Sequence, residues 1–432
     1  MFYSNRISHD DRTAIAAVLD IPHLIRHRHS VDSFFDDYRQ QAGIASARKL
    51  AGLREITPYL LDLISDEKTI YTAFKHMQAE GSHAPGPDGL RYEDIESFGV
   101  WKWCRNRRDT IRAGEYALST ERVQKIRKGP GRGFRELTIQ SVEDRVVQRA
   151  IVEILQPLLD PLFDSRSFGY RPKKGPLRAL AHAEYMHHKS DRGVWVSVDI
   201  KNAFPNVPVD RLLAVLRKYF DDDELMAFLK TVIQPDKTPG LRQGSPLSPL
   251  LLNLYLHHTL DRPWRRSHPN TPQLRFADDI LLLCRTRPKA RSAYRALADL
   301  LQPAGFTLKE NESDAIHRLA NGDRVQWMGY EIAAANHGLA YSVTDRAWEK
   351  LAETLEAAHG KPHAPIRAFQ SLVAWVNHKA PCYPHIERPW LYDRLKALAA
   401  AQGFDEIPTQ MELFDIWKLA YAHWCRMRKI VA

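Results

Sequence analysis

The sequence has few cysteines and lacks a long apolar run. Only four cysteines occur among 432 residues, and no two of them form a Cys-x-x-Cys pair. This spacing excludes a disulfide framework and a zinc ribbon and favours a reducing compartment. No stretch approaches the roughly 18 apolar residues of a membrane helix, and the N-terminus lacks the apolar segment of a signal peptide. We therefore expect a cytoplasmic protein without membrane contact.

The balance of charges is basic. The chain has 62 Lys and Arg against 52 Asp and Glu, a formal net charge of +10. A basic excess favours salt-dependent binding to polyanions. The 10 tryptophans and 16 tyrosines could stack on bases, although most of them are expected in the core. Composition agrees with a nucleic-acid-binding protein but does not by itself establish one.

Two adjacent carboxylates, Asp278 and Asp279, precede a run of four large aliphatic residues at 280–283. The run predicts a buried strand, and the acidic pair predicts the turn of a hairpin that leads into it. At the edge of an apolar core, desolvation and repulsion disfavour two ionised acids unless a cation is near. Mg²⁺ fits because it takes hard oxygen ligands from carboxylates and phosphates. The alternative is a plain Asp-Asp turn on a surface hairpin.

A third acid, Asp199, ends an alternating segment at 194–199 that predicts a strand. A strand that ends in Asp, beside a hairpin that carries Asp-Asp, can place three carboxylates on one sheet surface. Such a constellation holds two divalent ions and suits in-line displacement at phosphorus. This hypothesis is favoured over a simple strand-end role for Asp199.

An ordered series of motifs resembles the bacterial reverse transcriptases of the group II intron-like branch. The similarity covers most of the chain. In chain order the motifs are Ala-Pro-Gly-Pro-Asp-Gly at 84–89, Arg-Glu-Leu-Thr-Ile at 135–139, Asp-Arg-Val-Val-Gln at 144–148, Ser-Phe-Gly-Tyr-Arg-Pro at 167–172, the segment 199–204, Arg-Gln-Gly-Ser-Pro-Leu-Ser-Pro at 242–249, Phe-Ala-Asp-Asp at 276–279 and Trp-Met-Gly-Tyr at 327–330.

The resemblance implies an α+β fold, a right-hand polymerase with fingers, a palm of antiparallel sheet plus helices, and a helical thumb. We expect a helical N-terminal extension at 1–65, fingers at 66–192, the palm at 193–342 and the thumb at 343–432. The palm sheet should close with a hairpin between Trp327 and Tyr341. Before that, Ser248 is expected to cap a palm helix that has Pro249 in its first turn.

The resemblance also implies roles for individual residues. Asp199, Asp278 and Asp279 would be the catalytic carboxylates and metal ligands, and Ile200 would join them at the metal site. Phe204 would exclude a 2′-hydroxyl as a steric gate, although it also reads as a core residue. The expected nucleotide-binding residues are Lys128, Arg132, Arg135, Phe204 and Gln243, and the expected primer grip is Trp327, Met328, Gly329 and Tyr330.

The implied cofactor is Mg²⁺, as two ions, with Mn²⁺ as a substitute. The implied partners are an RNA template, dNTPs and the DNA product, and the template is expected to be a dedicated non-coding RNA. A homo-oligomer or a second polymerase partner stays open. The chain ends before the DNA-binding and nuclease segments that intron-encoded relatives carry, so we expect a stand-alone enzyme of the type used in antiviral defence.

One motif departs from the family's pattern. Glu312 stands where the family has a lysine that assists pyrophosphate departure, and Lys309 is the candidate substitute. Two alternatives stay open, namely template-independent or protein-primed DNA synthesis on the same palm and a maturase-like RNA-binding splicing factor. The presence of all three acids and of Phe204 disfavours a purely binding role.

Overall fold

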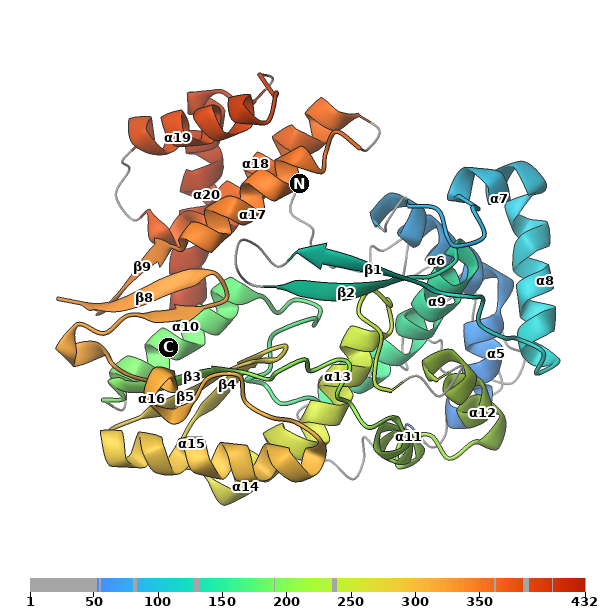
Figure 1. Cartoon of the computed structure of the whole chain (residues 1–432), viewed down its shortest axis with the longest axis horizontal. Coiled ribbons are helices and arrows are strands. Elements are labelled where there is room, and N and C mark those ends of the chain that lie inside the picture. Colours follow the sequence, from blue (N-terminus) through green and yellow to red (C-terminus); the bar gives the residue numbers. More distant parts are fainter. Residues whose placement is uncertain are drawn as a thin grey trace.

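The computed structural model describes residues 53, 56–80, 84–127, 133–189, 191–234, 239–336, 338–360, 363–383, 388–405 and 407–431 (Figure 1). The expected helical extension at 1–65 therefore lies largely outside the described residues. Its described end forms a 3-10 turn (Thr57–Tyr59) and α5 (Leu60–Ser65). Helices combined with antiparallel sheets confirm the α+β class.

The first part of the described chain is a group of helices with one two-stranded sheet. Helix α9 begins where Ser141 Oγ accepts the backbone N–H of Asp144 at 3.0 Å, which satisfies a donor of the first turn. The Asp144 carboxylate in turn accepts the hydroxyl of Tyr116 at 2.8 Å. The elements are α6 (Glu67–Glu80), α7 (Tyr92–Phe98), α8 (Val100–Arg112), β1 (Arg122–Arg127), β2 (Phe134–Ile139) and α9 (Val142–Leu159).

The central feature is an antiparallel sheet with strand order β4-β5-β3-β6. Its strands are β3 (Val194–Asp199), β4 (Gln273–Phe276), β5 (Asp279–Cys284) and β6 (Ile316–Arg318). Helices α10 (Pro176–Lys189) and α15 (Arg287–Leu301) cover opposite faces (Figure 1). Within β5, Ile280 and Leu282 join the core on the α15 side, whereas Leu281 and Leu283 join the core on the α10 side. Burial on both faces explains why this strand is apolar throughout.

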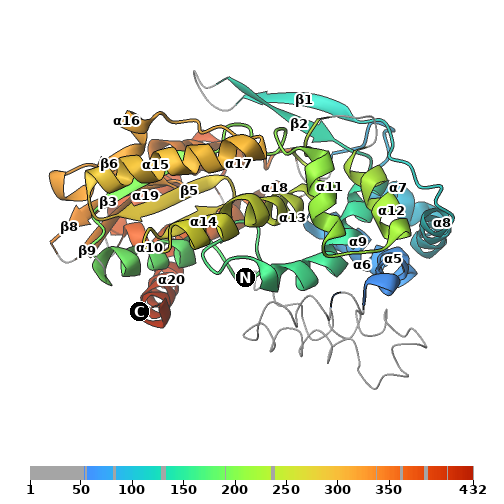
Figure 2. The same cartoon turned by 90° about the horizontal axis from the view of Figure 1, so that it is seen from below.

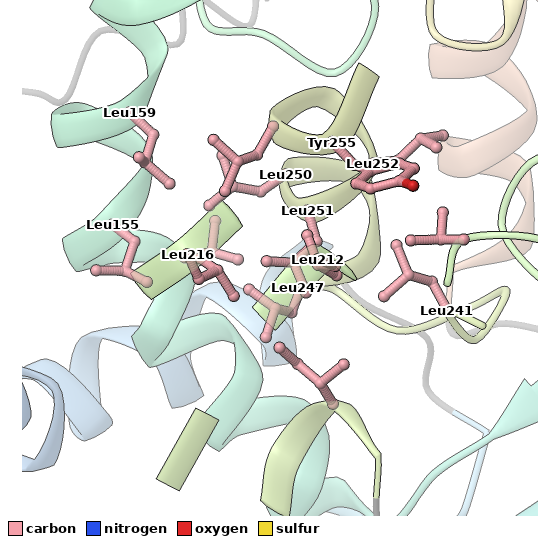
Figure 3. Packing of buried hydrophobic residues seen from close by; sticks show 14 of the residues in the cluster. Leu155, Leu159, Leu212, Leu216, Leu241, Leu247, Leu250, Leu251, Leu252 and Tyr255 are labelled. Carbon is pink, nitrogen blue, oxygen red and sulfur yellow. The ribbon is translucent and has the colours of Figure 1, made fainter. Parts of the chain in front are cut away.

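The largest core extends from the α15 face of the central sheet to α9, α11 (Val209–Arg217), α12 (Asp223–Ile233) and α13 (Ser248–Leu256). Each fully buried leucine contributes about 1.5–3 kcal/mol relative to an exposed one. Figure 3 shows several of these side chains meeting, namely Leu155, Leu159, Leu212, Leu216, Leu241, Leu247, Leu250, Leu251, Leu252 and Tyr255.

The start of α13 differs from the expected one. Ser248 is the first helical residue, so the prediction that it caps the helix is wrong. Ser245 Oγ instead accepts the backbone N–H groups of Leu247 at 3.2 Å and Ser248 at 3.3 Å. Pro249 does lie in the first turn, as predicted. The helix continues through a π-helical turn (His257–Asp261) into α14 (Arg262–Ser267).

A separate three-stranded sheet and the remaining helices complete the described chain. Strands β7 (Val325–Trp327), β8 (Tyr330–Ala335) and β9 (Gly338–Val343) pair with one another and not with the central sheet. The expectation that this hairpin closes the central sheet is therefore wrong, because β6 already occupies the edge beside β3. Figure 2 shows α20 beside α10. The remaining helices are α16 (Glu312–Ala315), α17 (Asp345–Glu356), α18 (Ala364–Lys379), α19 (Arg388–Ala401) and α20 (Gln410–Val431).

Candidate active site

Asp199 and Asp279 lie directly opposite each other at the same end of β3 and β5. Opposite residues of an antiparallel pair project from the same face, with Cβ atoms about 4.5–5.5 Å apart. Asp278 immediately precedes β5, and its carbonyl accepts the backbone N–H of Ile200 at 3.2 Å. The structure thus brings together the three acids that the sequence indicated, with Ile200 beside them. We call Asp199, Asp278 and Asp279 the carboxylate centre.

The turn that carries Asp278 is a tight hairpin with an unusual backbone. Phe276 and Asp279 are paired across it, so Ala277 and Asp278 form a two-residue loop. Ala277 has a φ of 59°, in the left-handed region. Two-residue hairpin loops favour positive φ, but an alanine reaches it at a steric cost. Interactions elsewhere must therefore hold the residue that precedes the acids.

A buried arginine holds this turn from below. Arg275 is fully buried, and its Nη1 donates to the carbonyl of Ala277 at 2.8 Å and to Asn253 Oδ1 at 2.9 Å. Its Nε and Nη2 donate to the two carboxylate oxygens of Asp261, at 2.9 and 2.7 Å. Asp261 is the last residue of the π-helical turn, a local distortion that often accompanies functional sites. Local patterns in the sequence do not predict this network, because the partners of Arg275 lie 14 and 22 residues away along the chain.

Gly169 completes the support of the turn from the other side. Its carbonyl accepts Asn253 Nδ2 at 2.8 Å, and the neighbouring Phe168 donates its N–H to the carbonyl of Arg275 at 2.8 Å. A Cβ on Gly169 would lie 2.3 Å from the backbone nitrogen of Ala277. The glycine in the Ser-Phe-Gly-Tyr-Arg-Pro motif is therefore needed for close approach of two backbones.

We expect Gly169→Ala to destabilise the fold by about 1–3 kcal/mol, because backbone cannot move aside as a flexible side chain would. Gly175→Ala is the matched control, since a Cβ there meets nothing within 4 Å. Thermal unfolding of the two variants measures the difference. Equal melting temperatures for both variants would contradict the close docking of Gly169 on the turn.

Burial raises the pKa of every acid in the carboxylate centre. Burial and then the adjacent Asp199 raise the pKa of Asp278 to about 6. Burial, followed by repulsion from Asp199 and Asp278, raises the pKa of Asp279 to about 8. Burial also raises the pKa of Asp199, against the opposing effect of Lys309. The centre is thus short of positive charge.

Lys309 and Glu310 lie beside Asp199. The backbone N–H of Asp199 donates to Glu310 Oε2 at 2.7 Å, and Lys309 Nζ lies 3.4 Å from Asp199 Oδ2. Glu312 is directed elsewhere, with its carboxylate 2.8 Å from Arg295 Nε and 3.5 Å from Arg291 Nε. The cation next to the centre is therefore Lys309, and Glu312 joins α16 to α15.

The carboxylate centre fits divalent ions whose coordination is completed by oxygens of a substrate. Asp199 Oδ1 is buried and has no hydrogen-bond partner within the described part of the chain. Across the described residues, no group of three or more His, Cys, Asp or Glu side chains is placed so that it could hold a metal ion. Mg²⁺ does not need such a group, because it is commonly held by one or two carboxylates plus phosphate oxygens. The donor set therefore suits Mg²⁺ bound together with a phosphorylated substrate.

The predicted nucleotide-binding residues have different outcomes. The carbonyl of Gln243 accepts the N–H of Thr138 at 2.8 Å, which ties its loop to β2. Arg135 lies in β2, but its side chain, and all of Lys128 and Arg132, fall outside the described residues. Their contacts with a nucleotide stay predictions.

Phe204 is half-buried in the segment that follows β3. Its ring meets that of Tyr170 edge-on, with centroids 6.2 Å apart. Its carbonyl accepts the N–H of Leu241 at 2.8 Å, which fixes the backbone after β3. The ring also packs against the largest core, as the core interpretation predicts, and its role as a steric gate stays a prediction.

The predicted primer grip is a second two-residue hairpin turn. Met328 and Gly329 have φ values of 52° and 75°, and they join the paired residues Trp327 and Tyr330. The carbonyl of Gly329 accepts Lys379 Nζ at 2.9 Å, so the turn is docked on α18. Contact of this turn with a primer stays a prediction.

Comparisons with known proteins agree with this arrangement of motifs. Residues 126–332 match the family described as reverse transcriptase (RNA-dependent DNA polymerase). Protein YkfC of Escherichia coli K12 is 27% identical over 211 residues, which cover 46% of this chain and 55% of YkfC. The group II intron-encoded protein LtrA of Lactococcus lactis is 30% identical over 158 residues, which cover 34% of this chain and 26% of LtrA.

Solved structures give a weaker similarity. A Cas6-RT-Cas1–Cas2 complex aligns with a TM-score of 0.37 and 16% identity, over 84% of this chain and 50% of that chain. The matches to LtrA and YkfC span 26% and 55% of those relatives' own lengths.

None of the described helices is long and apolar enough to cross a membrane.

Proposed function

We propose that the chain is an RNA-directed DNA polymerase that adds dNTPs at the carboxylate centre, and the match of residues 126–332 to the reverse transcriptase family supports this. The observation that carries this proposal is the placement of Asp199 opposite Asp279, with Asp278 in the turn between β4 and β5. Three half-buried carboxylates at the end of one sheet are what phosphoryl transfer with two divalent ions requires.

The residues of the chain have distinct proposed tasks. Asp199, Asp278 and Asp279, together with Ile200, would hold two Mg²⁺ or Mn²⁺ ions. When bound, the ions supply positive charge to the attacking and leaving oxygens of an in-line displacement. Lys309, 3.4 Å from Asp199, is the candidate cation for the departing pyrophosphate in place of a lysine at position 312.

Other assignments belong to the same proposal. We assign fingers to 66–192, the palm to 193–342 and the thumb to 343–432, with the turn at 327–330 as the primer grip. Arg135, Lys128 and Arg132 would contact the triphosphate from the β1–β2 hairpin. The tie between Gln243 and β2 supports this, because it brings that hairpin to the loop that precedes α13.

Primer extension on an RNA template of defined sequence tests the proposal. With Mg²⁺ and four dNTPs we expect a DNA product complementary to the template. A parallel reaction without template separates this activity from template-independent or protein-primed synthesis. If equal product forms without template, one of those alternatives replaces the proposal. If no product forms when template, Mg²⁺ and dNTPs are all present, the proposal is overturned.

We expect Phe204→Ala to relax selection of the sugar. The half-buried ring lies beside Tyr170 and would exclude a 2′-hydroxyl from the nucleotide pocket. Loss of a clash of this kind should raise the relative use of ribonucleotides by roughly 10-fold or more, since each 1.4 kcal/mol is a factor of ten. Single-nucleotide extension with dNTP and rNTP measures the ratio. An unchanged ratio would make Phe204 a core residue only.

We further propose that the template is a dedicated non-coding RNA and that the cytoplasmic setting is antiviral defence. The support is the resemblance of the ordered motifs to stand-alone bacterial reverse transcriptases. Sequencing of nucleic acid that copurifies with the protein tests this. A single enriched RNA is the expected result, and an unenriched sample of cellular RNA would contradict it.

A further inference from the structure

A cavity lies at the end of the central sheet that is remote from the carboxylate centre. The cavity has a volume of about 440 Å³. Strands β3 and β5 pair Asp199 with Asp279 at one end and Val194 with Cys284 at the other. Five residues of strand separate the two ends by roughly 17 Å. The lining residues are Arg192, His268, Asn270, Thr271, Cys284, Arg285, Lys289, Ser292 and Ala293.

The charge on this cavity is of one sign. Arg192, Arg285 and Lys289 carry positive charge at neutral pH, and all three line the cavity. No carboxylate is among the described residues that line the cavity. Burial, and then repulsion from Arg285, lowers the pKa of the Arg192 guanidinium. Cations gathered in this way are unfavourable unless an anion offsets them.

The Arg192 guanidinium is held in a fixed position. Its Nη1 donates to the carbonyls of Asn270 at 2.7 Å and Leu283 at 3.3 Å. Its Nε is buried and has no hydrogen-bond partner in the part of the chain that the structure describes. A guanidinium that the backbone holds in place at the wall of a cavity is preorganised for an oxyanion.

The start of α15 adds a third feature. The helix begins at Arg287, where Thr286 Oγ1 accepts the N–H of Lys289 at 3.4 Å. A helix N-terminus carries partial positive charge and favours acidic side chains. The first turn of α15 has no acidic residue and instead has Arg287 and Lys289. The helix dipole repels these two cations, and a bound anion would offset the repulsion.

We propose that this cavity binds phosphate groups of an RNA backbone at a place separate from the carboxylate centre. Guanidinium groups match the paired oxygens of a phosphodiester, and a cavity of this size admits about one nucleotide. The choice of RNA over an acidic peptide rests on the proposed function and on the net charge of +10. RNA held here would be anchored at the far end of the sheet while another segment is copied.

The test removes two of the cations and leaves Arg192 in place, because Arg192 bonds to the backbone. Binding of a labelled 20-nucleotide single-stranded RNA is measured by fluorescence anisotropy at several salt concentrations. Arg285→Gln/Lys289→Gln should weaken binding roughly tenfold near 0.1 M salt and reduce the salt slope by about 1.4, the value for two lost phosphate contacts on a single strand. Lys218→Gln/Lys230→Gln removes equal charge from exposed positions and should change neither quantity.

Further arms separate the remaining explanations. The charge-conserving Arg285→Lys/Lys289→Arg variant should bind RNA like the wild-type protein, which excludes misfolding as the cause of the loss. Incorporation on a short primer–template is measured in parallel, so failure of the polymerase proposal would appear there while the RNA result stands. The inference is overturned if both Gln double variants bind alike. It is also overturned if free phosphate or polyglutamate, but not RNA, distinguishes the Arg285→Gln/Lys289→Gln variant from the wild-type protein.

Discussion

Asp199→Asn is expected to lower the rate of nucleotide addition by about a thousandfold or more. Asn keeps the shape of the side chain and the backbone bond from residue 199 to Glu310, but it removes the negative charge. The melting temperature should stay equal or rise, because burial disfavours an ionised carboxylate at this position. Loss of activity without loss of stability is the signature of a catalytic carboxylate.

Asp299→Asn is the matched control for this substitution. Asp299 is exposed on α15, so the same change of charge is made outside the carboxylate centre. Single-turnover incorporation and thermal unfolding are compared for both variants. If Asp199→Asn keeps more than about a tenth of the wild-type rate, the residue supplies far less stabilisation than a metal ligand should.

Asp261→Ala should produce the largest loss of stability, about 3–5 kcal/mol. Arg275 is fully buried, and removing Asp261 would leave its guanidinium without its carboxylate partner. The exposed pair of Asp223 with Arg217 serves as control, because Asp223→Ala should cost no more than about 1 kcal/mol. Denaturant unfolding of both variants gives the comparison.

The same substitution should also reduce activity in the fraction that remains folded. Arg275 holds the carbonyl of Ala277, and the left-handed backbone there directs the two acids that follow. Wild-type stability of Asp261→Ala would show that the buried pair is not needed for the fold. Full activity in a destabilised variant would show that the turn is held by other contacts, such as the approach of Gly169.

The carboxylate centre was predictable because its parts follow from local patterns. An alternating segment that ends in Asp199 and an aliphatic run after Asp279 both predict strands. Opposite residues of antiparallel strands share a face, so the register of the two strands is enough to place the acids together. That the two strands are neighbours follows from the resemblance of the ordered motifs, not from the local patterns.

The supports of the centre were not predictable in the same way. Arg275 reaches Asp261 and Asn253 across a π-helical turn, and no local periodicity indicates a contact of that kind. The predicted cap of α13 was wrong because Ser248 is already inside the helix, and Ser245 Oγ accepts the backbone N–H groups of residues 247 and 248 instead. Both cases depend on three-dimensional contacts between side chain and backbone.

Glu312 stands where the family has a lysine, and its contacts show why one position of a motif has to be interpreted together with the residues around it. The sequence offered Glu312 in place of a lysine and Lys309 as the substitute. In the structure, Glu312 pairs with Arg291 and Arg295, and Lys309 lies against Asp199. A position counted along a motif therefore does not determine which side chain meets the centre.

Direct measurement of Mn²⁺ binding tests the central claim, that Asp199, Asp278 and Asp279 form a divalent-ion centre. Free Mn²⁺ is followed by electron paramagnetic resonance as the wild-type protein and Asp199→Asn/Asp278→Asn are titrated in the presence of a dNTP. Loss of the ions bound by the wild-type protein, with Asp299→Asn unaffected, is the predicted result. Equal Mn²⁺ binding by the double variant and the wild-type protein would contradict the account.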